Sequence, residues 1–254
     1  MSTPTFKIRA LTLEDVPAAA QLSADAFTTD RQTEMKGLGK KPFDMKKYTL
    51  DSMPVMLANP RCVVIKAVDD TNGDIMGYCT WGFRGIAPEE MPAVEGRAHS
   101  SRPPAPPPPP SPPATTAKSD AASEPTPEDE TDPIQRLQAL TNADMNAWMA
   151  EVMPEGARCL FVIGLAVAPA YQGRGVGRAL LRWGTDVCDA RGAFAWVHSS
   201  EPAWAMYAKS GFEVVRSLDV DLDEYAPMPP PNEGPDAKWG HYVFRYMKYL
   251  PKYL

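Results

Sequence analysis

The stretch "GLAVAPAYQGRGVGRALL", residues 164–181, joins an apolar run to an amphipathic one through three glycines and two arginines. The N-terminus of a helix leaves main-chain N–H groups unpaired and carries a partial positive charge. Glycines let an anion approach the backbone closely. We therefore expect a strand, a glycine-rich loop and a helix here, with the loop binding the phosphate or diphosphate of a ligand.

Two common phosphate-binding motifs do not fit this loop. A P-loop ends in Gly-Lys-Ser/Thr, which the loop lacks. The dinucleotide motif G-x-G-x-x-G fails because Arg178 or Leu180 occupies the place of its third glycine. The pattern that remains is Q-x-x-G-x-G, formed by Gln172, Gly175 and Gly177.

The sequence around the loop alternates between strand and helix patterns. Residues 158–169 form a continuous apolar run, which is typical of a strand in the middle of a sheet. The N-terminal half ends in two β-rich runs around Asn72-Gly73, a strong hairpin signal. The other expected elements are a strand before Thr12, helices at 15–27, at 43–58 with a break at Pro54, and at 133–152, a helix ending at Gly192, a strand at 193–199, a short helix at 201–212, and strands at 213–222 and 241–250. This order predicts a mixed α/β sheet with helices on its faces.

Composition changes sharply between the two halves. Residues 103–113 hold nine prolines in eleven positions, and residues 119–133 are acidic without a lysine or arginine. Such segments favour extended polyproline II and do not form a packed core. We expect residues 88–132 to be a disordered insert, which serves either as a solvated spacer or as a ligand for an SH3, WW or profilin-like partner at 103–113.

The overall composition is that of a globular protein. The chain has 254 residues, 44% apolar content and a net charge of −6, which makes general nucleic-acid binding unexpected. Its four cysteines are far apart and predict neither structural zinc nor disulfides. The N-terminus lacks an apolar signal core, and the longest apolar run is too short for a bilayer. We expect a cytoplasmic protein, with a nuclear location equally compatible.

Two motifs together resemble the GCN5-related N-acetyltransferases, the GNAT superfamily. Residues 164–181 resemble motif A of that family, a strand, a Gln/Arg-x-x-Gly-x-Gly/Ala loop and a helix. "AWAMYAKSGFEVV" resembles motif B, with Ala203, Tyr207, Gly211 and Phe212 at the spacing A-x-x-x-Y-x-x-x-G-F. The resemblance implies one GNAT domain over residues 1–254, built on a mixed, mostly antiparallel, splayed seven-stranded sheet flanked by helices. It does not cover the insert.

The resemblance also implies acetyl-CoA as co-substrate, with no metal. The main chain of Leu165, Ala166 and Val167 would pair with the pantetheine amides, and an N–H near Val167 would face the thioester oxygen. The main-chain amides that would hold the diphosphate belong to Gln172, Gly173, Arg174, Gly175, Val176, Gly177 and Arg178.

Tyr207 matches the family position that often protonates the leaving thiolate. The general base is less evident, because the central strand offers no carboxylate. His198 closes the next strand and could titrate near neutrality, so we name it as the candidate, with Glu201 and Asp223 as weaker ones.

Motif B often opens with an asparagine where this chain has Ser200. Serine is similar to what fungal members carry there, and it could cap the short helix and donate to the cofactor. Trp204 is a further candidate for lining the cofactor channel, although core burial is an equally good expectation. Lys209 could touch a CoA phosphate or be solvated.

The predicted function is transfer of an acetyl group from acetyl-CoA to a primary amine, by direct attack in a ternary complex. The alternative is a non-catalytic CoA-binding or scaffold protein with a proline-rich arm that binds a partner. The acceptor stays open between a small molecule, a peptide N-terminus and a lysine. We expect no membrane contact, and a monomer or a homodimer.

Overall fold

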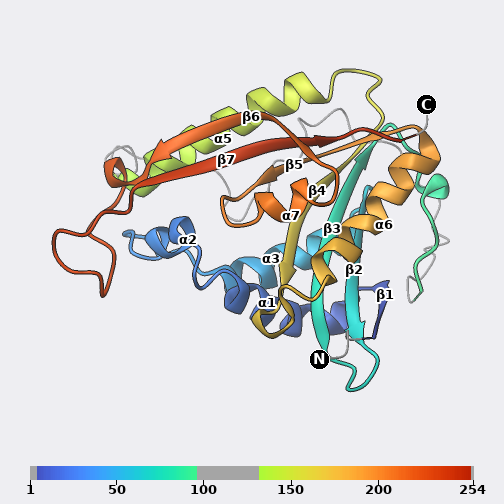
Figure 1. Cartoon of the computed structure of the whole chain (residues 1–254), viewed down its shortest axis with the longest axis horizontal. Coiled ribbons are helices and arrows are strands. Elements are labelled where there is room, and N and C mark those ends of the chain that lie inside the picture. The colour runs from blue at the N-terminus through green and yellow to red at the C-terminus, as the bar shows by residue number, and fades with distance from the viewer. Residues whose placement is uncertain (1–4, 96–131, 253–254) are drawn as a thin grey trace.

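The computed structural model describes residues 5–95 and 132–252 and shows seven strands in one mixed sheet (Figure 1). The strand order is β1-β2-β3-β4-β5-β7-β6, and only β4 and β5 pair in parallel. The strands are β1 (Phe6–Ala10), β2 (Cys62–Asp69), β3 (Ile75–Arg84), β4 (Cys159–Val167), β5 (Phe194–Ser199), β6 (Glu213–Asp221) and β7 (His241–Tyr249). The predicted seven-stranded, mostly antiparallel sheet is confirmed.

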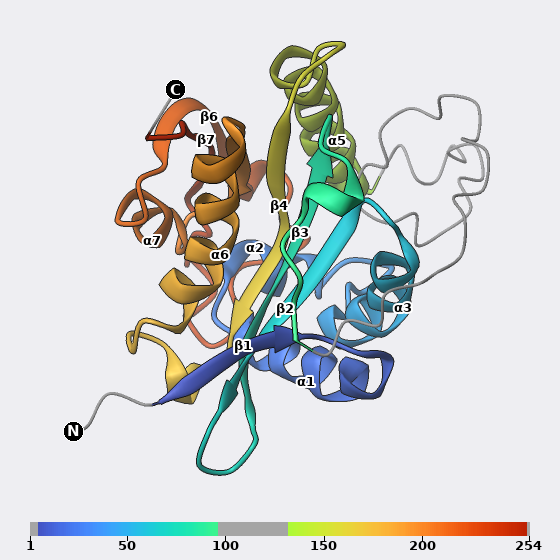
Figure 2. The same cartoon turned by 90° about the vertical axis from the view of Figure 1, so that its right-hand side faces the viewer.

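Helices cover both faces of this sheet. They are α1 (Val16–Ala26), α2 (Arg31–Lys36), α3 (Met45–Ala58), α5 (Pro133–Val152), α6 (Val176–Arg191) and α7 (Trp204–Ala208), with short 3-10 turns at Leu13–Asp15, Pro88–Glu90, Pro169–Tyr171 and Leu222–Glu224. Figure 2 shows α6 on one side of β2, β3 and β4, and α1 and α3 on the other. We call these sides the α6 face and the α1 face.

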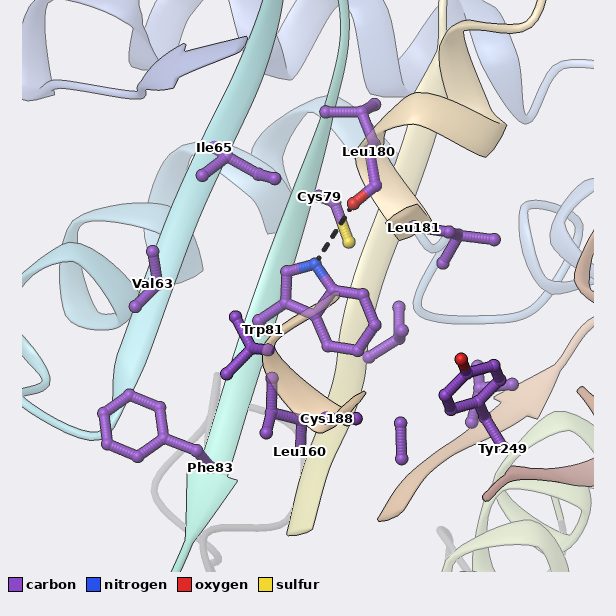
Figure 3. Close-up of a cluster of buried hydrophobic side chains, with 14 of the residues drawn as sticks. Val63, Ile65, Cys79, Trp81, Phe83, Leu160, Leu180, Leu181, Cys188 and Tyr249 are labelled. Carbon is purple, nitrogen blue, oxygen red and sulfur yellow. Dashed lines mark hydrogen bonds between the residues drawn. The ribbon is translucent and has the colours of Figure 1, made fainter. Parts of the chain in front are cut away.

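The main hydrophobic core lies between the sheet and α6, and Trp81 of β3 is at its centre (Figure 3). Trp81 is fully buried, and its indole N–H donates to the main-chain oxygen of Leu180 at 3.4 Å. A Cβ atom at Gly184 of α6 would lie 2.3 Å from the Trp81 ring. Helix α6 therefore sits directly on β3 because residue 184 has no side chain, and this contact fixes the start of α6 relative to β4.

The α1 face carries the helices other than α6 and α7. Val16, Ala19 and Leu22 of α1 pack on Tyr78 of β3 and Ala166 of β4. Helix α5 runs along β6 and β7 in Figure 1 and places Trp148 and Met149 on Trp196 of β5 and Tyr246 of β7. Its first turns place Ile134 and Leu137 beside Met35 of α2 and Phe244 of β7. The two ends of the sheet are thus covered separately on this face.

The sequence analysis made one wrong prediction about a helix and missed another helix. Helix α3 continues through Pro54 without a break. The carbonyl that loses its hydrogen-bond donor there belongs to Leu50, which is exposed, so water can take the place of the missing N–H. Helix α2 was not expected, although Asp30 caps it by accepting from the Thr33 main-chain N–H at 2.9 Å.

The predicted boundaries of the disordered insert, residues 88–132, are too wide, because residues 88–95 belong to the folded part of the chain. Met91 and Val94 are buried in the main core, and the Glu95 carbonyl accepts a hydrogen bond from the Ala10 N–H at 2.8 Å. At the other end, Asp132 caps α5. These apolar contacts attach residues 88–95 to the sheet. Residues 96–131, including the proline-rich 103–113, lie outside the described residues, so that part stays a prediction.

Among the helices of residues 5–95 and 132–252, none combines the length and hydropathy of a membrane-spanning segment. The same ranges contain no cluster of three or more His, Cys, Asp or Glu side chains placed to bind a metal ion. All four cysteines are buried, and none of them forms a disulfide within the described part of the chain.

Candidate active site

Strands β4 and β5 separate at the centre of the sheet. Their parallel pairing begins at Cys159 with Phe194 and ends at Val162 with Val197. Strand β4 continues to Val167, and on its other side it stays paired with β3. From residue 163 onward, the edge of β4 that faces β5 therefore has no strand partner, as the predicted splay requires.

A β-bulge lies where the two strands part. Thr80 of β3 pairs with Gly164, but Trp81 pairs with Val162, so Ile163 is an extra residue on β4. The Ala168 N–H donates to the Met76 carbonyl on β3. Because main-chain groups alternate in direction along an antiparallel pair, those of Leu165 and Val167 point away from β3 toward the open edge, and those of Ala166 point to β3. Leu165 and Val167, two of the three candidate residues on β4, thus direct their main-chain polar groups toward the open edge.

The glycine-rich loop continues directly from this edge. Gln172 returns to β4, where its side-chain amide donates to the Val167 carbonyl at 3.1 Å. Gly173 and Gly175 have φ of 73° and 86°, a region that favours glycine, and Gly175 is the residue that precedes α6. No side chain caps the first turn of α6. The N–H groups at this helix start are therefore available to an anion.

The third glycine of the motif has a different role. A Cβ atom at Gly177 would lie 2.4 Å from the sulfur of Met206 on α7, whereas a Cβ at Gly173 or Gly175 would meet no described atom within 4 Å. Gly177 therefore permits close packing of α6 on α7, and the other two glycines keep the loop surface bare. Arg174 and Arg178 are exposed beside it, and the Arg174 guanidinium lies 5.8 Å from the centre of the Tyr171 ring.

Tyr207 is buried on α7 in the α6 face. Its ring packs edge-on against Phe212 at 5.7 Å. Burial raises the pKa of the Tyr207 phenol, so the hydroxyl keeps its proton. The structure thus presents a protonated hydroxyl on the same face as the loop.

His198 lies on the opposite face, at the first position of β5 beyond its pairing with β4. Its ring stacks on Phe244 and Tyr246 of β7, with centroid distances of 4.9 and 4.6 Å. The Nε2 atom is buried without a hydrogen-bond partner among the described residues. Burial lowers the pKa of His198 to about 4, although the nearby Asp144 charge opposes the shift. The expected titration near neutrality is therefore wrong.

The depressed pKa of His198 predicts a stability change with pH. Between pH 6.5 and 4, His198 is protonated in the unfolded chain but not in the folded chain. The free energy of unfolding therefore decreases as the pH falls through this range. The full difference is about 3 kcal/mol, lost progressively as pH falls through that window. Urea unfolding at pH 4–7 should show a smaller loss for His198→Asn than for the wild type. Equal losses would contradict the assignment.

His241→Asn is the matched control for this measurement. The exposed His241 ring pairs with Asp219 at 2.9 Å, which raises the pKa of the histidine. Its contribution is therefore present at low pH and lost above it, the opposite sign to that of His198. The two variants should change the pH profile in opposite directions.

The turn between β5 and α7 differs from the expectation for Ser200. Ala203 is the residue before α7 and no side chain caps this helix, so the predicted serine cap is wrong. Instead, the Ser200 carbonyl accepts from the Ser199 hydroxyl and the Ala203 N–H. Helix α7 begins at Trp204, too far along the chain for Ser200 to cap its first turn. Trp204 is 38% exposed beneath the Arg245 guanidinium, so it is not a core residue.

Sequence reasoning missed a buried polar contact beside this turn. The Tyr242 hydroxyl of β7 donates to the Asp30 carboxylate at 2.7 Å. Asp before Arg31–Lys36 was a readable helix-start signal, but nothing in the sequence joins it to Tyr242. The carboxylates named as weaker base candidates have other surroundings. Asp223 accepts from two main-chain N–H groups of the β6–β7 loop.

Comparison with known proteins agrees with this geometry. Residues 126–212 match the sequence profile of the Acetyltransferase (GNAT) family. Among solved structures, a polyamine N-acetyltransferase from Drosophila melanogaster is similar at 15% identity and a TM-score of 0.53, covering 97% of this chain and all of its own. An arylalkylamine N-acetyltransferase 7 described as putative, from the yellow fever mosquito, is similar at 16% identity and a TM-score of 0.56, with 96% and 87% covered. A search of curated proteins finds no match.

Proposed function

We propose that this chain, which belongs to the acetyltransferase (GNAT) family, transfers the acetyl group of acetyl-CoA to a primary amine by direct attack in a ternary complex. Members of this family use acetyl-CoA as co-substrate, and the chain is an acyltransferase of the N-acetyltransferase type. The specific parts of the proposal are the mechanism and the roles of the residues. One observation carries them: the unpaired edge of β4 leads directly into the uncapped, glycine-lined start of α6.

The residues present fit acetyl-CoA as an extended ligand. The free main-chain groups of Leu165 would pair with the pantetheine amides, as a sheet edge pairs with an added strand, whereas the Val167 carbonyl already accepts from Gln172. The amides of Gly173 to Arg178 would hold the diphosphate, with Arg174 and Arg178 adding positive charge. Ser200 and Trp204 remain proposed contacts of the cofactor on the β5 side of the gap between β4 and β5, since both follow the end of β5.

The reacting groups would approach from opposite faces of the sheet. The amine nitrogen forms a bond to the acetyl carbon, and the bond from that carbon to sulfur breaks. The Val167 N–H would donate to the carbonyl oxygen as negative charge develops on it. The Tyr207 hydroxyl, on the α6 face, would donate a proton to the leaving thiolate and regain one from solvent before the next turnover.

His198 is the proposed acceptor of the proton that the amine loses. It lies on the α1 face, and its imidazole is neutral near pH 7 because burial depresses its pKa. A neutral imidazole keeps one ring nitrogen that can accept a hydrogen bond from the amine. We expect His198→Asn to lower kcat/KM for the amine at least about tenfold, with the Kd for acetyl-CoA unchanged. An unchanged kcat/KM would exclude this role.

Thiol release from acetyl-CoA with a panel of amines tests the function as a whole. Release that depends on both acetyl-CoA and an amine supports the transferase. Binding of acetyl-CoA without release under any amine would favour the CoA-binding alternative, and no binding at all would favour a scaffold.

A further inference from the structure

Gly164 lies on the α1 face of the sheet, at the point where β4 leaves β5. It pairs with Thr80, two residues from the pair Tyr78 and Ala166. Tyr78 and Ala166 face α1, and side chains two positions apart in a strand share a face. A side chain at residue 164 would therefore point toward the α1 face, the side on which His198 stacks on β7.

The space in front of Gly164 is open. A Cβ atom built there would meet no described atom within 4 Å, although the residue is in the central strand. Two glycines of the adjacent strand β3 differ from it. A Cβ at Gly82 would lie 2.4 Å from the Phe161 ring, and one at Gly77 would lie 2.8 Å from the Ala166 carbonyl oxygen.

Neither backbone conformation nor packing requires glycine at residue 164. Its φ is not among the positive values, so any L-residue could adopt its conformation. Glycine in a strand is also less stable than alanine, because the unfolded chain has more freedom to lose. We therefore look for a functional reason, and not a structural one, for the absence of a side chain at residue 164.

The position of the space supplies that reason. Gly164 follows Val162, the last residue of β4 that pairs with β5, and precedes Leu165 and Val167, whose main-chain groups point away from β3 toward the open edge. His198 is the first residue of β5 beyond the pairing. The opening thus connects the open edge of β4 with the α1 face.

We propose that Gly164 keeps open the passage through which the acceptor amine reaches the acetyl group, and that it limits how bulky the acceptor is next to its nitrogen. This inference rests on the proposed function and extends it to acceptor selection. Each atom added at residue 164 would occupy the path of the amine and leave the diphosphate loop untouched. Amines on an unbranched carbon would pass most easily, and amines on a branched carbon would be excluded first.

Gly164→Ala and Gly164→Val, assayed with butylamine, sec-butylamine and the best amine of the panel, test the passage. We expect kcat/KM for the amine to fall about tenfold in Gly164→Ala and about a hundredfold in Gly164→Val, with sec-butylamine affected most. The Kd for acetyl-CoA should stay within about twofold of the wild-type value. The added side chain would point to the α1 face, away from the loop at the start of α6. The melting temperature of Gly164→Ala should not fall.

Gly82→Ala is the matched control, a glycine-to-alanine change on the same face of the neighbouring strand. Its Cβ would clash with Phe161, so we expect a lower melting temperature. Unchanged kcat/KM for the amine in both Gly164 variants would overturn the proposal of a passage. A loss of acetyl-CoA affinity as large as the loss in kcat/KM would also overturn it, because the space would then be occupied by the cofactor. A wild type that binds acetyl-CoA but acetylates no amine would instead contradict the proposed function, and with it this inference.

Discussion

Gly175→Glu should weaken acetyl-CoA binding by at least about a hundredfold while the protein stays folded. Gly175 lies at the uncapped start of α6, in open space and with φ of 86°. A carboxylate there would stand where the diphosphate is proposed to bind. Two like charges about 5 Å apart repel by about 3 kcal/mol at the effective dielectric of a protein surface, which corresponds to this loss. Isothermal titration calorimetry with acetyl-CoA measures it.

Gly156→Glu is the control for this experiment. Gly156 has φ of 80° in an exposed turn, and a Cβ there would also meet no described atom within 4 Å. The substitution therefore adds the same charge and the same backbone strain, about 1 kcal/mol, at a place away from the loop. We expect both variants to melt at similar temperatures and only Gly175→Glu to lose the ligand. Retained affinity in Gly175→Glu would refute the assignment of the loop.

Tyr207→Phe should lower kcat about a hundredfold, with a much smaller change in the Kd for acetyl-CoA. The substitution removes the hydroxyl proposed to donate to the thiolate and keeps the ring that packs on Phe212. Because burial raises the pKa of the phenol, the loss should be the same across the neutral pH range. Steady-state kinetics together with calorimetry separate the effect on turnover from the effect on binding.

Tyr249→Phe provides the comparison for Tyr207→Phe. Tyr249 belongs to the same hydrophobic core and is as deeply buried, but its hydroxyl donates to the Asp189 carboxylate at 2.9 Å. Its loss should cost about 1 kcal/mol of stability and leave kcat unchanged. If both variants had equal kcat, Tyr207 would have no role in the chemistry.

Much of the fold was predictable because its decisive segments are local patterns. The apolar run of β4, the glycine loop and the amphipathic α6 form one continuous stretch, residues 159–191, and each part has its own periodicity. The hairpin around Gly73 was predictable from its turn residues, and the helix Pro133–Val152 from helical propensity.

The parts that could not be predicted depend on contacts between distant segments. The bulge at Ile163 follows from the register of β4 on β3. The open space at Gly164 arises because α1 and α5 pack on different parts of the α1 face. The pKa of His198 depends on Phe244 and Tyr246, which lie more than forty residues away along the chain. The missing cap at Ser200 shows the same limit, since the start of a five-residue helix is set by its packing on α6.

A crystal structure with coenzyme A tests the central claim most directly, that the main-chain amides at the start of α6 bind the diphosphate. We predict diphosphate oxygens within hydrogen-bond distance of the N–H groups between Gly173 and Arg178, and pantetheine along β4 beside Leu165 and Val167. Coenzyme A bound elsewhere, with the loop in contact only with solvent, would contradict the account.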